Sequence, residues 1–332
     1  MNILVTGASG FIGSFVVAEA LRRDMQVWAG VRHSSSRQWL GQEGIRFLEL
    51  DFEHPEALKA TLDTFHRTSG TFDVIVHCAG VTKCKDPADF ERVNRGHTVC
   101  LAKLLGELDM LPRQFIFLST LSIFGPIREA DFSEIRLDDT PQPNTAYGRS
   151  KLLAERDLQG MPDLPYVFLR PTGVYGPRER DYLMAMRAIA RHVDFAAGRS
   201  RQDLTFVYVD DVVQAIFRVI DSGVTRRAYF LSDGEVYRTS DFSRIVRREL
   251  GNPFVLNFAC PLWLLKLISS AAEKLCRHKV SPLNSDKYRI MAQRNWRCDI
   301  RPAIDEIGYR PQFNLDRGLK ATVAWYKQQG WL

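Results

Sequence analysis

A tyrosine and a lysine four residues apart, Tyr147 and Lys151, carry the first chemical signal in this sequence. Positions i and i+4 of a helix lie on the same face, so a phenol and an ammonium group would stand side by side there. Such a pair can share a proton with an oxygen atom of a bound substrate. The positive charge would also lower the pKa of the phenol from its ordinary value of about 10. The same spacing fits a surface helix with a solvated lysine, so the pair gains meaning only from the elements that position it.

A glycine-rich turn near the N-terminus predicts a dinucleotide site. Residues 2–6 form a short apolar run typical of a buried strand, and residues 14–23 carry apolar side chains on one helical face. Between them, Gly7, Gly10 and Gly13 are spaced Gly-x-x-Gly-x-x-Gly. Glycines at a strand–helix turn let the backbone approach a pyrophosphate, whose negative charge the helix N-terminus favours. A glycine turn without a ligand is the alternative.

The chain then alternates strand-like apolar runs with helical segments. Repeated β-α units predict an α/β fold, a doubly wound parallel sheet (Rossmann fold), with ligands at the carboxyl ends of the strands. After about residue 176 the pattern loosens, and between residues 252 and 301 it disappears. We therefore expect an NAD(P)-binding Rossmann domain over residues 1–176 and a smaller substrate-binding lobe over residues 177–332, with crossings back. Strands are expected at residues 25–31, 45–50, 72–78, 114–119, 166–169 and 204–209, and helices at residues 57–65, 87–108, 145–158, 182–190 and from residue 211.

The end of the second expected strand bears on the choice of coenzyme. An NAD site usually places Asp or Glu about 20 residues after the glycines, where the carboxylate binds ribose hydroxyls. Residues 30–37 contain no carboxylate and place Arg32 at this point. A guanidinium group suits the 2′-phosphate of NADP(H). The sequence therefore favours NADP(H), whereas a solvated Arg32 would leave NAD(H) open.

Composition narrows the class of protein. The chain has 332 residues, 45% apolar and 25% charged, and its net charge of +6 contains no block of like charges that would indicate nucleic-acid binding. The cysteines are isolated, without a C-x-x-C pair, which predicts reduced thiols rather than disulfides or a metal site. No charged leader precedes the first strand, so we expect a cytoplasmic protein. The six cysteines are Cys78, Cys84, Cys100, Cys260, Cys276 and Cys298.

With the glycine turn and the Tyr–Lys pair, the chain resembles the extended short-chain dehydrogenase/reductase family, which is NAD-dependent epimerase/dehydratase-like. Further stretches match the pattern of that family in the same order along nearly the whole chain, with a weak region at residues 235–295. The matching stretches are residues 51–52, 76–80, 93–96, 118–125, 169–177, 209–212, 307–311 and 325–326.

The resemblance implies a role for each matching residue. Tyr147 would be the acid/base, and Lys151 would hold the nicotinamide ribose and favour the ionised form of Tyr147. Thr120 would hydrogen-bond the substrate oxygen, with Ser122 as a competing candidate. Asn94 would support the site from the long helix, or would serve the structure alone. Together with Arg32, the expected coenzyme contacts are Gly7, Gly10, Phe11 and Ile12 at the pyrophosphate, Asp51 and Phe52 at the adenine, Cys78, Ala79 and Gly80 at the middle of the coenzyme, and Asn94, Tyr147, Lys151, Pro171 and Val174.

These parts imply a reaction. Hydride would pass between the nicotinamide C4 and a substrate carbon, while a proton passes between Tyr147 and the oxygen on that carbon, oriented by Thr120. Sugar-nucleotide 4,6-dehydratases place an Asp-Glu pair just after the Ser/Thr, where this chain has Leu121 and Ser122, which cannot replace it. Sugar-nucleotide epimerases commonly carry Asn at the position of Gly173. This version looks more like the 3β-hydroxysteroid dehydrogenase and dihydroflavonol reductase branches.

We therefore expect an NAD(P)-dependent ketone reductase or secondary-alcohol dehydrogenase that acts on a fairly apolar small molecule. A nucleotide-sugar 4-epimerase or reductase is the alternative enzyme. A non-catalytic coenzyme-binding regulatory protein is a further alternative, against which the intact Thr120, Tyr147 and Lys151 argue. The resemblance also implies a homodimer formed through helices that include the one bearing Tyr147.

An apolar segment over residues 254–276 contains the start of a strongly apolar helix, with Pro261 suited to its first turn. Three interpretations compete: a core helix of the smaller lobe, a wall of an apolar substrate pocket, and peripheral contact with a membrane surface. The uninterrupted apolar run is shorter than the ~20 residues that a membrane span requires.

Overall fold

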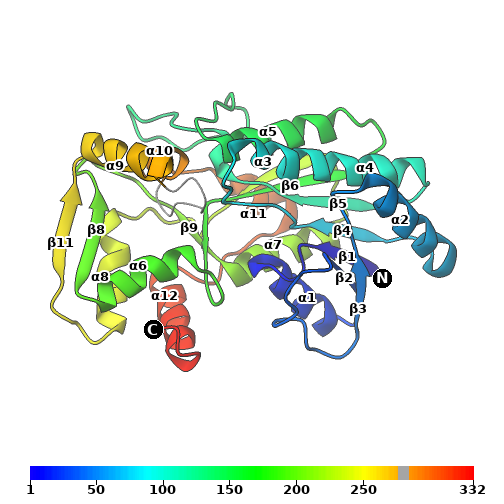
Figure 1. The fold of residues 1–332 in the computed structure, drawn as a ribbon, viewed down its shortest axis with the longest axis horizontal. Helices are drawn as coiled ribbons and strands as arrows, with labels where there is room; N and C mark the ends of the chain where they lie inside the picture. Colours follow the sequence, from blue (N-terminus) through cyan, green and yellow to red (C-terminus); the bar gives the residue numbers. More distant parts are fainter. Residues whose placement is uncertain (276–283) are drawn as a thin grey trace.

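A seven-stranded sheet forms the centre of the molecule, and the computed structural model describes residues 1–275 and 284–332 (Figure 1). Its strands are β1 (Asn2–Thr6), β2 (Gln26–Val31), β3 (Ile45–Glu49), β4 (Val74–His77), β5 (Gln114–Leu118), β6 (Tyr166–Pro171) and β10 (Arg227–Leu231). They are ordered β10-β6-β5-β4-β1-β2-β3, and every neighbouring pair is parallel. Helices cover both faces of such a sheet, which explains why its strands read as continuous apolar runs in the sequence.

Successive side chains of a strand enter two separate cores. Ile3 and Val5 of β1 belong to one core, and Leu4 belongs to the other. The first core contains side chains from α1 (Phe11–Arg22), α7 (Val209–Ser222) and α11 (Arg301–Ile307), and the second contains side chains from α2 (Pro55–Ser69), α4 (Thr98–Glu107) and α5 (Ala146–Gln159). The α/β fold with a doubly wound parallel sheet is thus confirmed.

The strand order reverses between β1 and β4. The chain goes from β1 to β2 and β3 on one side of the sheet, and then builds β4, β5, β6 and β10 on the other. In doubly wound sheets, ligands bind in the crevice outside the carboxyl ends of the strands at such a reversal. Gly7 follows β1 and Cys78 follows β4, so both border this crevice.

A smaller group of elements lies at the left of Figure 1. Its core is rich in aromatic side chains, among them Tyr175, Phe206, Phe242 and Tyr326. Two short parallel sheets, β7–β9 and β8–β11, belong to this part of the chain. The elements are β7 (Gly173–Tyr175), α6 (Asp181–Ala190), β8 (Val193–Ala197), β9 (Phe206–Tyr208), α8 (Thr239–Glu249), β11 (Leu256–Cys260), α9 (Leu262–Leu275), α10 (Ser285–Ala292) and α12 (Leu315–Gln328).

Segments beyond residue 176 also contribute to the central sheet and its layers. β10 is the edge strand next to β6, and α7 and α11 pack on one face. The division of the chain at residue 176 stays a prediction, because nothing in the fold separates the two parts cleanly at that point.

The helix expected over residues 87–108 contains an irregular turn. The structure has α3 (Pro87–Phe90), a π-helical turn η1 (Glu91–His97) and then α4. The helix expected at residues 57–65 is longer, because Pro55 fits the first turn of α2 and Gly70, with a φ of +84°, ends it. β11 lies in a region for which no strand was predicted. Among the cysteines, Cys276 lies outside the described residues and the other five are free thiols.

Candidate active site

The turn after β1 packs closely against the backbone of the loop after β4. Gly7 has a φ of +64°, and a Cβ atom at this position would lie 2.7 Å from the backbone nitrogen of Ala79. The Gly10 amide donates to the Gly7 carbonyl at 2.9 Å, and no side chain caps α1 at Gly10. The first amide groups of a helix have no partner within it, so those of Phe11 and Ile12 can bind an anion. The contact of Gly7, Gly10, Phe11 and Ile12 with a pyrophosphate stays a prediction, and these unpaired amides are compatible with it.

Asn94 connects the loop after β4 to the helix that bears Tyr147. Its Oδ1 accepts a hydrogen bond from the Val81 amide at 2.8 Å, and its Nδ2 donates to the Val81 carbonyl and the Ser150 hydroxyl, both at 3.0 Å. A Cβ atom at Gly80 would lie 2.9 Å from Asn94 Oδ1. Asn94 is fully buried within the π-helical turn, and such turns are frequent at functional sites. The hydrogen bonds of Asn94 fit the structural role that the sequence left open. A contact of Asn94 with the coenzyme stays a prediction.

A buried chain of hydrogen bonds runs beneath the same loop. Thr98 Oγ1 donates to the Asn94 carbonyl at 2.8 Å and so accepts from His77 Nε2 at 2.9 Å. The other ring nitrogen, His77 Nδ1, then accepts from Thr6 Oγ1 at 2.9 Å. Burial, with a smaller effect of the Lys151 charge, lowers the pKa of His77 to about 3, so the ring is neutral. The sequence predicts no role for His77, although a histidine at the end of an apolar strand is a signal for one.

Two caps hold the N-terminus of α5, the helix that carries Tyr147. Thr145 Oγ1 accepts from the Gly148 amide at 3.0 Å. The carboxylate of Asp286, on α10, accepts from the Ala146 amide at 2.8 Å and from the Tyr147 amide at 3.3 Å. A carboxylate stabilises a helix N-terminus through these bonds and through the helix dipole. Asp286 therefore links the smaller group of elements to the turn that presents Tyr147, a link that no local pattern predicts.

Thr120 and Tyr147 meet at the carboxyl end of β5. Thr120 Oγ1 donates to the Ser122 hydroxyl at 3.2 Å and accepts from the Ser122 amide at 3.1 Å. It also lies close enough to the phenol of Tyr147 to act on its pKa. The ring of Phe90 lies 6.0 Å from the ring of Tyr147. Burial raises the pKa of Tyr147 to about 12, and Thr120 opposes this only in part. The pKa of Tyr147 is therefore raised, not lowered as expected from Lys151, because loss of solvent dominates.

Lys151 is buried behind Tyr147 on the same face of α5. Its Nζ donates to the Leu118 carbonyl at 2.9 Å and lies 4.4 Å from the centre of the Phe117 ring. Burial lowers the pKa of Lys151 to about 8, while the negative charge of Glu155, one turn further along the helix, opposes the shift. Glu155 is itself held by Arg170 through two buried hydrogen bonds of 3.0 and 2.6 Å. The ammonium group thus faces the end of β5 beside the phenol.

Polar and aromatic side chains gather at the ends of β2 and β3. Arg32 is exposed, and within the described residues its guanidinium has no hydrogen bond or ion pair. Asp51 accepts a hydrogen bond from His54 Nδ1 at 2.8 Å. The Phe52 ring stacks on His97 with 5.5 Å between centres, and the charges of Arg32 and Asp51 both act on the pKa of His97, which burial lowers. Arg32, which follows β2, thus lies near Asp51 and Phe52, which follow β3. All three are predicted coenzyme contacts.

The stretch after β6 lies beside the same edge of the sheet. Pro171 ends β6 next to Leu231 of β10, and Val174 pairs with Val207 in the β7–β9 sheet. Thr172 Oγ1 is buried and has no hydrogen-bond partner among the described residues. Ser119 Oγ, at the end of β5, is orphaned in the same way. Buried hydroxyls without partners are candidates for ligand contacts, and the sequence predicts a role for neither of these two.

A tyrosine occupies the space beside Gly173. A Cβ atom at Gly173 would lie 2.2 Å from the Tyr182 hydroxyl oxygen and 3.4 Å from the Phe206 ring. An asparagine at position 173 would therefore collide with Tyr182 unless this ring moved. The glycine that distinguishes this chain from the epimerase pattern is thus part of a packed aromatic arrangement.

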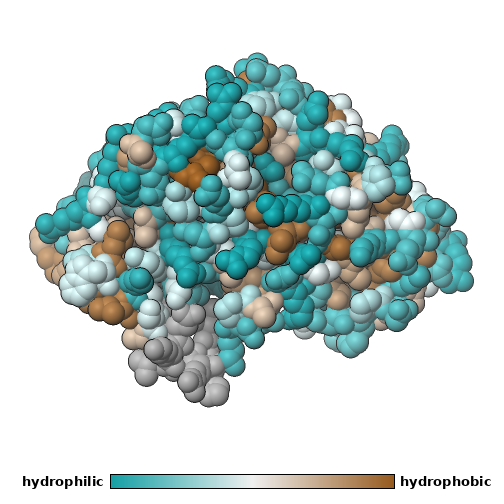
Figure 2. All heavy atoms as spheres, turned by 90° about the horizontal axis from the view of Figure 1, so that it is seen from above, coloured by the Kyte–Doolittle hydropathy of each residue, from teal (hydrophilic) through white to brown (hydrophobic). Residues whose placement is uncertain are grey.

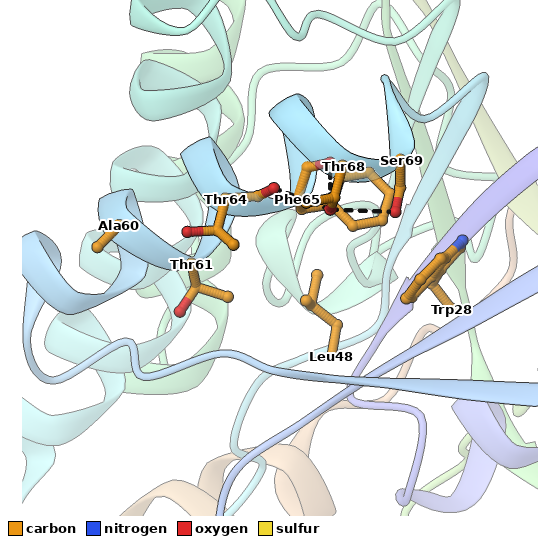
Figure 3. Close-up of a pocket in the computed structure, with 8 residues that line it drawn as sticks. All are labelled: Trp28, Leu48, Ala60, Thr61, Thr64, Phe65, Thr68 and Ser69. Carbon is orange, nitrogen blue, oxygen red and sulfur yellow. Dashed lines mark hydrogen bonds between the residues drawn. The ribbon is translucent and has the colours of Figure 1, made fainter.

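A hollow elsewhere on the molecule contains none of these residues. Figure 3 shows it between α2 and the strands β2 and β3. Among the described residues, no group of three or more His, Cys, Asp or Glu side chains could hold a metal ion. The residues that line the hollow are Trp28, Leu48, Ala60, Thr61, Thr64, Phe65, Thr68 and Ser69.

Comparisons with known proteins find relatives that match nearly the whole chain. A probable dTDP-glucose 4,6-dehydratase of Sinorhizobium fredii is 26% identical over 100% of this chain and 94% of the relative. A decarboxylating sterol-4-alpha-carboxylate 3-dehydrogenase of Schizosaccharomyces pombe is 22% identical over 98% of this chain and 97% of the relative. The structure of UDP-glucose 4-epimerase from Thermotoga maritima with UDP-glucose has a TM-score of 0.79 at 22% identity, covering 99% of each chain.

The family model for the NAD dependent epimerase/dehydratase family matches residues 3–231, which include the glycine turn, Thr120, Tyr147 and Lys151. This match spans more than half of the chain. The chain belongs to the NAD dependent epimerase/dehydratase family.

Proposed function

We propose that this member of the family is an NADP(H)-preferring ketone reductase or secondary-alcohol dehydrogenase with a fairly apolar substrate. The observation that carries the proposal is the group at the end of β5, where Thr120 lies beside Tyr147 and the Leu118 carbonyl accepts a hydrogen bond from Lys151. A hydroxyl, a phenol and an ammonium group suffice to bind one substrate oxygen and to exchange one proton with it.

A bound nicotinamide coenzyme supplies or accepts hydride at its C4 atom. In the reducing direction, the Tyr147 phenol gives its proton to the oxygen of the carbonyl carbon that receives the hydride, and an alcohol forms. Thr120 orients that oxygen, and the Lys151 ammonium stabilises the phenolate that remains until solvent returns a proton. A pKa of about 12 keeps Tyr147 protonated near neutral pH, which suits the donor role.

Two features support a ketone rather than a nucleotide sugar as the substrate. Leu121 and Ser122 follow Thr120 and offer no acid and base for the elimination of water. Tyr182 and Phe206 fill the space next to Gly173 with aromatic surface instead of an amide.

The screen that tests the reaction uses the full chain with NADPH and with NADH against steroid, aromatic, acyl and sugar-nucleotide ketones. We expect coenzyme oxidation with an apolar ketone, about 10²–10⁴-fold slower for Tyr147→Phe because the proton donor is lost. Thr120→Ala should also slow turnover strongly, whereas Ser122→Ala should retain most of it. Unchanged activity of Tyr147→Phe on every accepted ketone would falsify the mechanism.

The coenzyme preference rests on Arg32 and on the lack of a carboxylate at the end of β2. Arg32→Ala should raise the Kd for NADPH about tenfold, because a charge-assisted hydrogen bond to the 2′-phosphate is lost, and should leave the Kd for NADH unchanged. Arg37→Ala is the matched control, since the Arg37 guanidinium packs on the Phe47 ring at 4.2 Å. Equal affinity for both coenzymes, insensitive to Arg32→Ala, would contradict the preference.

A nucleotide-sugar 4-epimerase or reductase is the second candidate, favoured by the epimerases among the similar structures. An epimerase retains its NAD(H) through purification and shows no net coenzyme consumption. A reductase exchanges its coenzyme freely. The absorbance spectrum of the purified protein and turnover with UDP-sugars therefore separate the two enzymes. A protein that binds the coenzyme but turns over no ketone and no nucleotide sugar would fit the regulatory alternative.

A further inference from the structure

The two-stranded sheet of β8 and β11 presents an apolar face to solvent. The parallel register pairs Val193 with Leu256 and Phe195 with Phe258. Alternate residues of a strand point to the same face, so these four side chains stand together on one face of the sheet. All four are exposed, Phe258 at 54%. The apolar face of this sheet is thus in contact with solvent.

The opposite face of this sheet carries smaller and more polar side chains, and its β8 residues are partly covered. Asp194, between Val193 and Phe195, accepts a hydrogen bond from the Ser243 hydroxyl of α8 at 2.8 Å. Asn257 is the register partner of Asp194. A one-sided sheet of a monomeric protein normally buries its apolar face and solvates its polar face. The β8–β11 sheet therefore leaves its apolar face uncovered, which indicates that this face meets another apolar phase.

The helix that follows β11 extends the same character. In α9, Leu265 is buried, whereas Trp263 is 65% and Leu267 60% exposed, with Ile268 also exposed. The core-helix interpretation of this segment therefore does not account for most of its large apolar side chains. Phe254, just before β11, is 72% exposed. Brown side chains in Figure 2 gather at the left end, where Figure 1 places β8, β11 and α9.

We call these eight residues the end surface. They are Val193, Phe195, Phe254, Leu256, Phe258, Trp263, Leu267 and Ile268.

The charges around the end surface are almost all positive. Arg187, Arg191 and Arg199 stand in residues 187–199, where Asp194 is the one acid and its carboxylate is bound to α8. In residues 252–272 the one charged side chain is that of Lys266, and it is exposed. A second copy docked face to face would bring like charges together. A lipid bilayer with negative headgroups and an apolar interior matches both the positive charges around the end surface and its apolar side chains.

We propose that the end surface binds an anionic lipid bilayer as a peripheral contact. The aromatic side chains Phe195, Phe258 and Trp263 enter the boundary between headgroups and acyl chains, and Arg191 and Lys266 contact lipid phosphates. No described helix is long and apolar enough to cross a membrane, so the contact lies in the plane of the bilayer surface. The attachment does not depend on the proposed reaction.

Vesicle co-sedimentation of the full chain tests this contact. The protein should sediment with vesicles of phosphatidylcholine and phosphatidylglycerol, and far less with phosphatidylcholine alone or at high salt. Phe258→Ser and Trp263→Ser should each weaken binding about tenfold, since one buried aromatic side chain is lost. Arg191→Glu should weaken it at least about tenfold, because one attraction becomes a repulsion.

Matched controls separate this contact from other causes. Val236→Ser changes an apolar side chain that is 43% exposed but lies outside the end surface, and it should bind vesicles like the wild type. Tyr147→Phe should also bind normally, so a failure of the proposed reaction stays distinguishable from a failure of the membrane contact. Circular dichroism and the melting temperature of each variant verify folding.

Two outcomes overturn the proposal. One is no sedimentation with anionic vesicles at low salt. The other is vesicle binding that Phe258→Ser, Trp263→Ser and Arg191→Glu leave unchanged. If the same variants instead abolish a concentration-dependent dimer seen by analytical ultracentrifugation, the end surface is an interface between copies of this chain and the lipid assignment is wrong.

Discussion

Burial sets the protonation of the two central side chains in opposite directions. It raises the pKa of Tyr147 to about 12 and lowers that of Lys151 to about 8. Both shifts favour the neutral form, since a charge loses solvation inside the protein. Lys151 nevertheless carries its charge at pH 7, at a cost to the folded state. The site is thus arranged for proton transfer rather than for stability.

Replacing Lys151 should separate these two properties. Lys151→Met removes a buried charge, so the unfolding free energy of the coenzyme-free protein at pH 7 should rise by a value on the order of 2 kcal/mol, and the melting temperature should rise with it. Turnover should fall about 10²–10⁴-fold. The folded pKa of about 8 lies below the unfolded value of 10.5, so the wild-type penalty is complete below pH 8 and vanishes as the pH approaches 10.5. Thermal melts from pH 6 to about 10 measure the difference. A variant less stable than the wild type at pH 7 would contradict this account.

At the scale of elements, α5 is fixed from both sides. Asn94 in the π-helical turn binds Ser150 of α5, and Asp286 of α10 binds the amides of its first turn. The Arg170 side chain of β6 holds Glu155 further along. Because these partners come from separate parts of the chain, the direction in which Tyr147 points depends on the packing of the whole molecule.

Loss of the Asp286 cap should affect both stability and rate. Asp286→Ala should cost about 1 kcal/mol of unfolding free energy and lower kcat several-fold, because the first turn of α5 loses its acceptor. Asp286→Asn keeps an acceptor oxygen and should restore much of kcat. The control is Asp305→Ala, which removes an exposed carboxylate from α11. A lower melting temperature with unchanged kcat in Asp286→Ala would show that the cap serves stability alone.

At the scale of the whole molecule, the C-terminal helix closes the structure. The Tyr326 hydroxyl on α12 donates to the carbonyl of Gly176 at 3.0 Å and to that of Glu179 at 2.5 Å. Gly318, on the same helix, packs so closely on Tyr175 that an added Cβ atom would lie 2.0 Å from the Tyr175 hydroxyl oxygen. α12 therefore anchors residues 176–180, the segment between β7 and α6. This segment begins within the family stretch of residues 169–177.

Removing the Tyr326 hydroxyl should destabilise the protein globally. Tyr326→Phe leaves two carbonyl groups without this donor, so the unfolding free energy should fall by about 1–3 kcal/mol. Activity at low temperature should change little, since Tyr326 lies outside the active site. Urea unfolding measures the loss, with Tyr288→Phe as the control, because no hydrogen bond of the Tyr288 hydroxyl occurs among the described residues. Equal midpoints for the two variants would refute the anchoring role.

Local patterns in the sequence predicted what depends on neighbouring residues. The apolar runs of β1 to β6, the glycine turn, the helix expected over residues 145–158 and the Tyr147–Lys151 spacing all follow from short-range periodicity and turn chemistry. The family resemblance then supplied Thr120, which the structure places beside Tyr147.

The tertiary structure decided what depends on distant residues and on burial. Asp286 meets Tyr147 across 139 positions, Tyr182 fills the space at Gly173, and β10 completes the sheet. Burial and distant residues also decide the direction in which the pKa of Tyr147 shifts and the exposure of the apolar face of β8 and β11. A residue's solvation and its long-range partners are properties of the packed chain, so spacing along the sequence does not encode them.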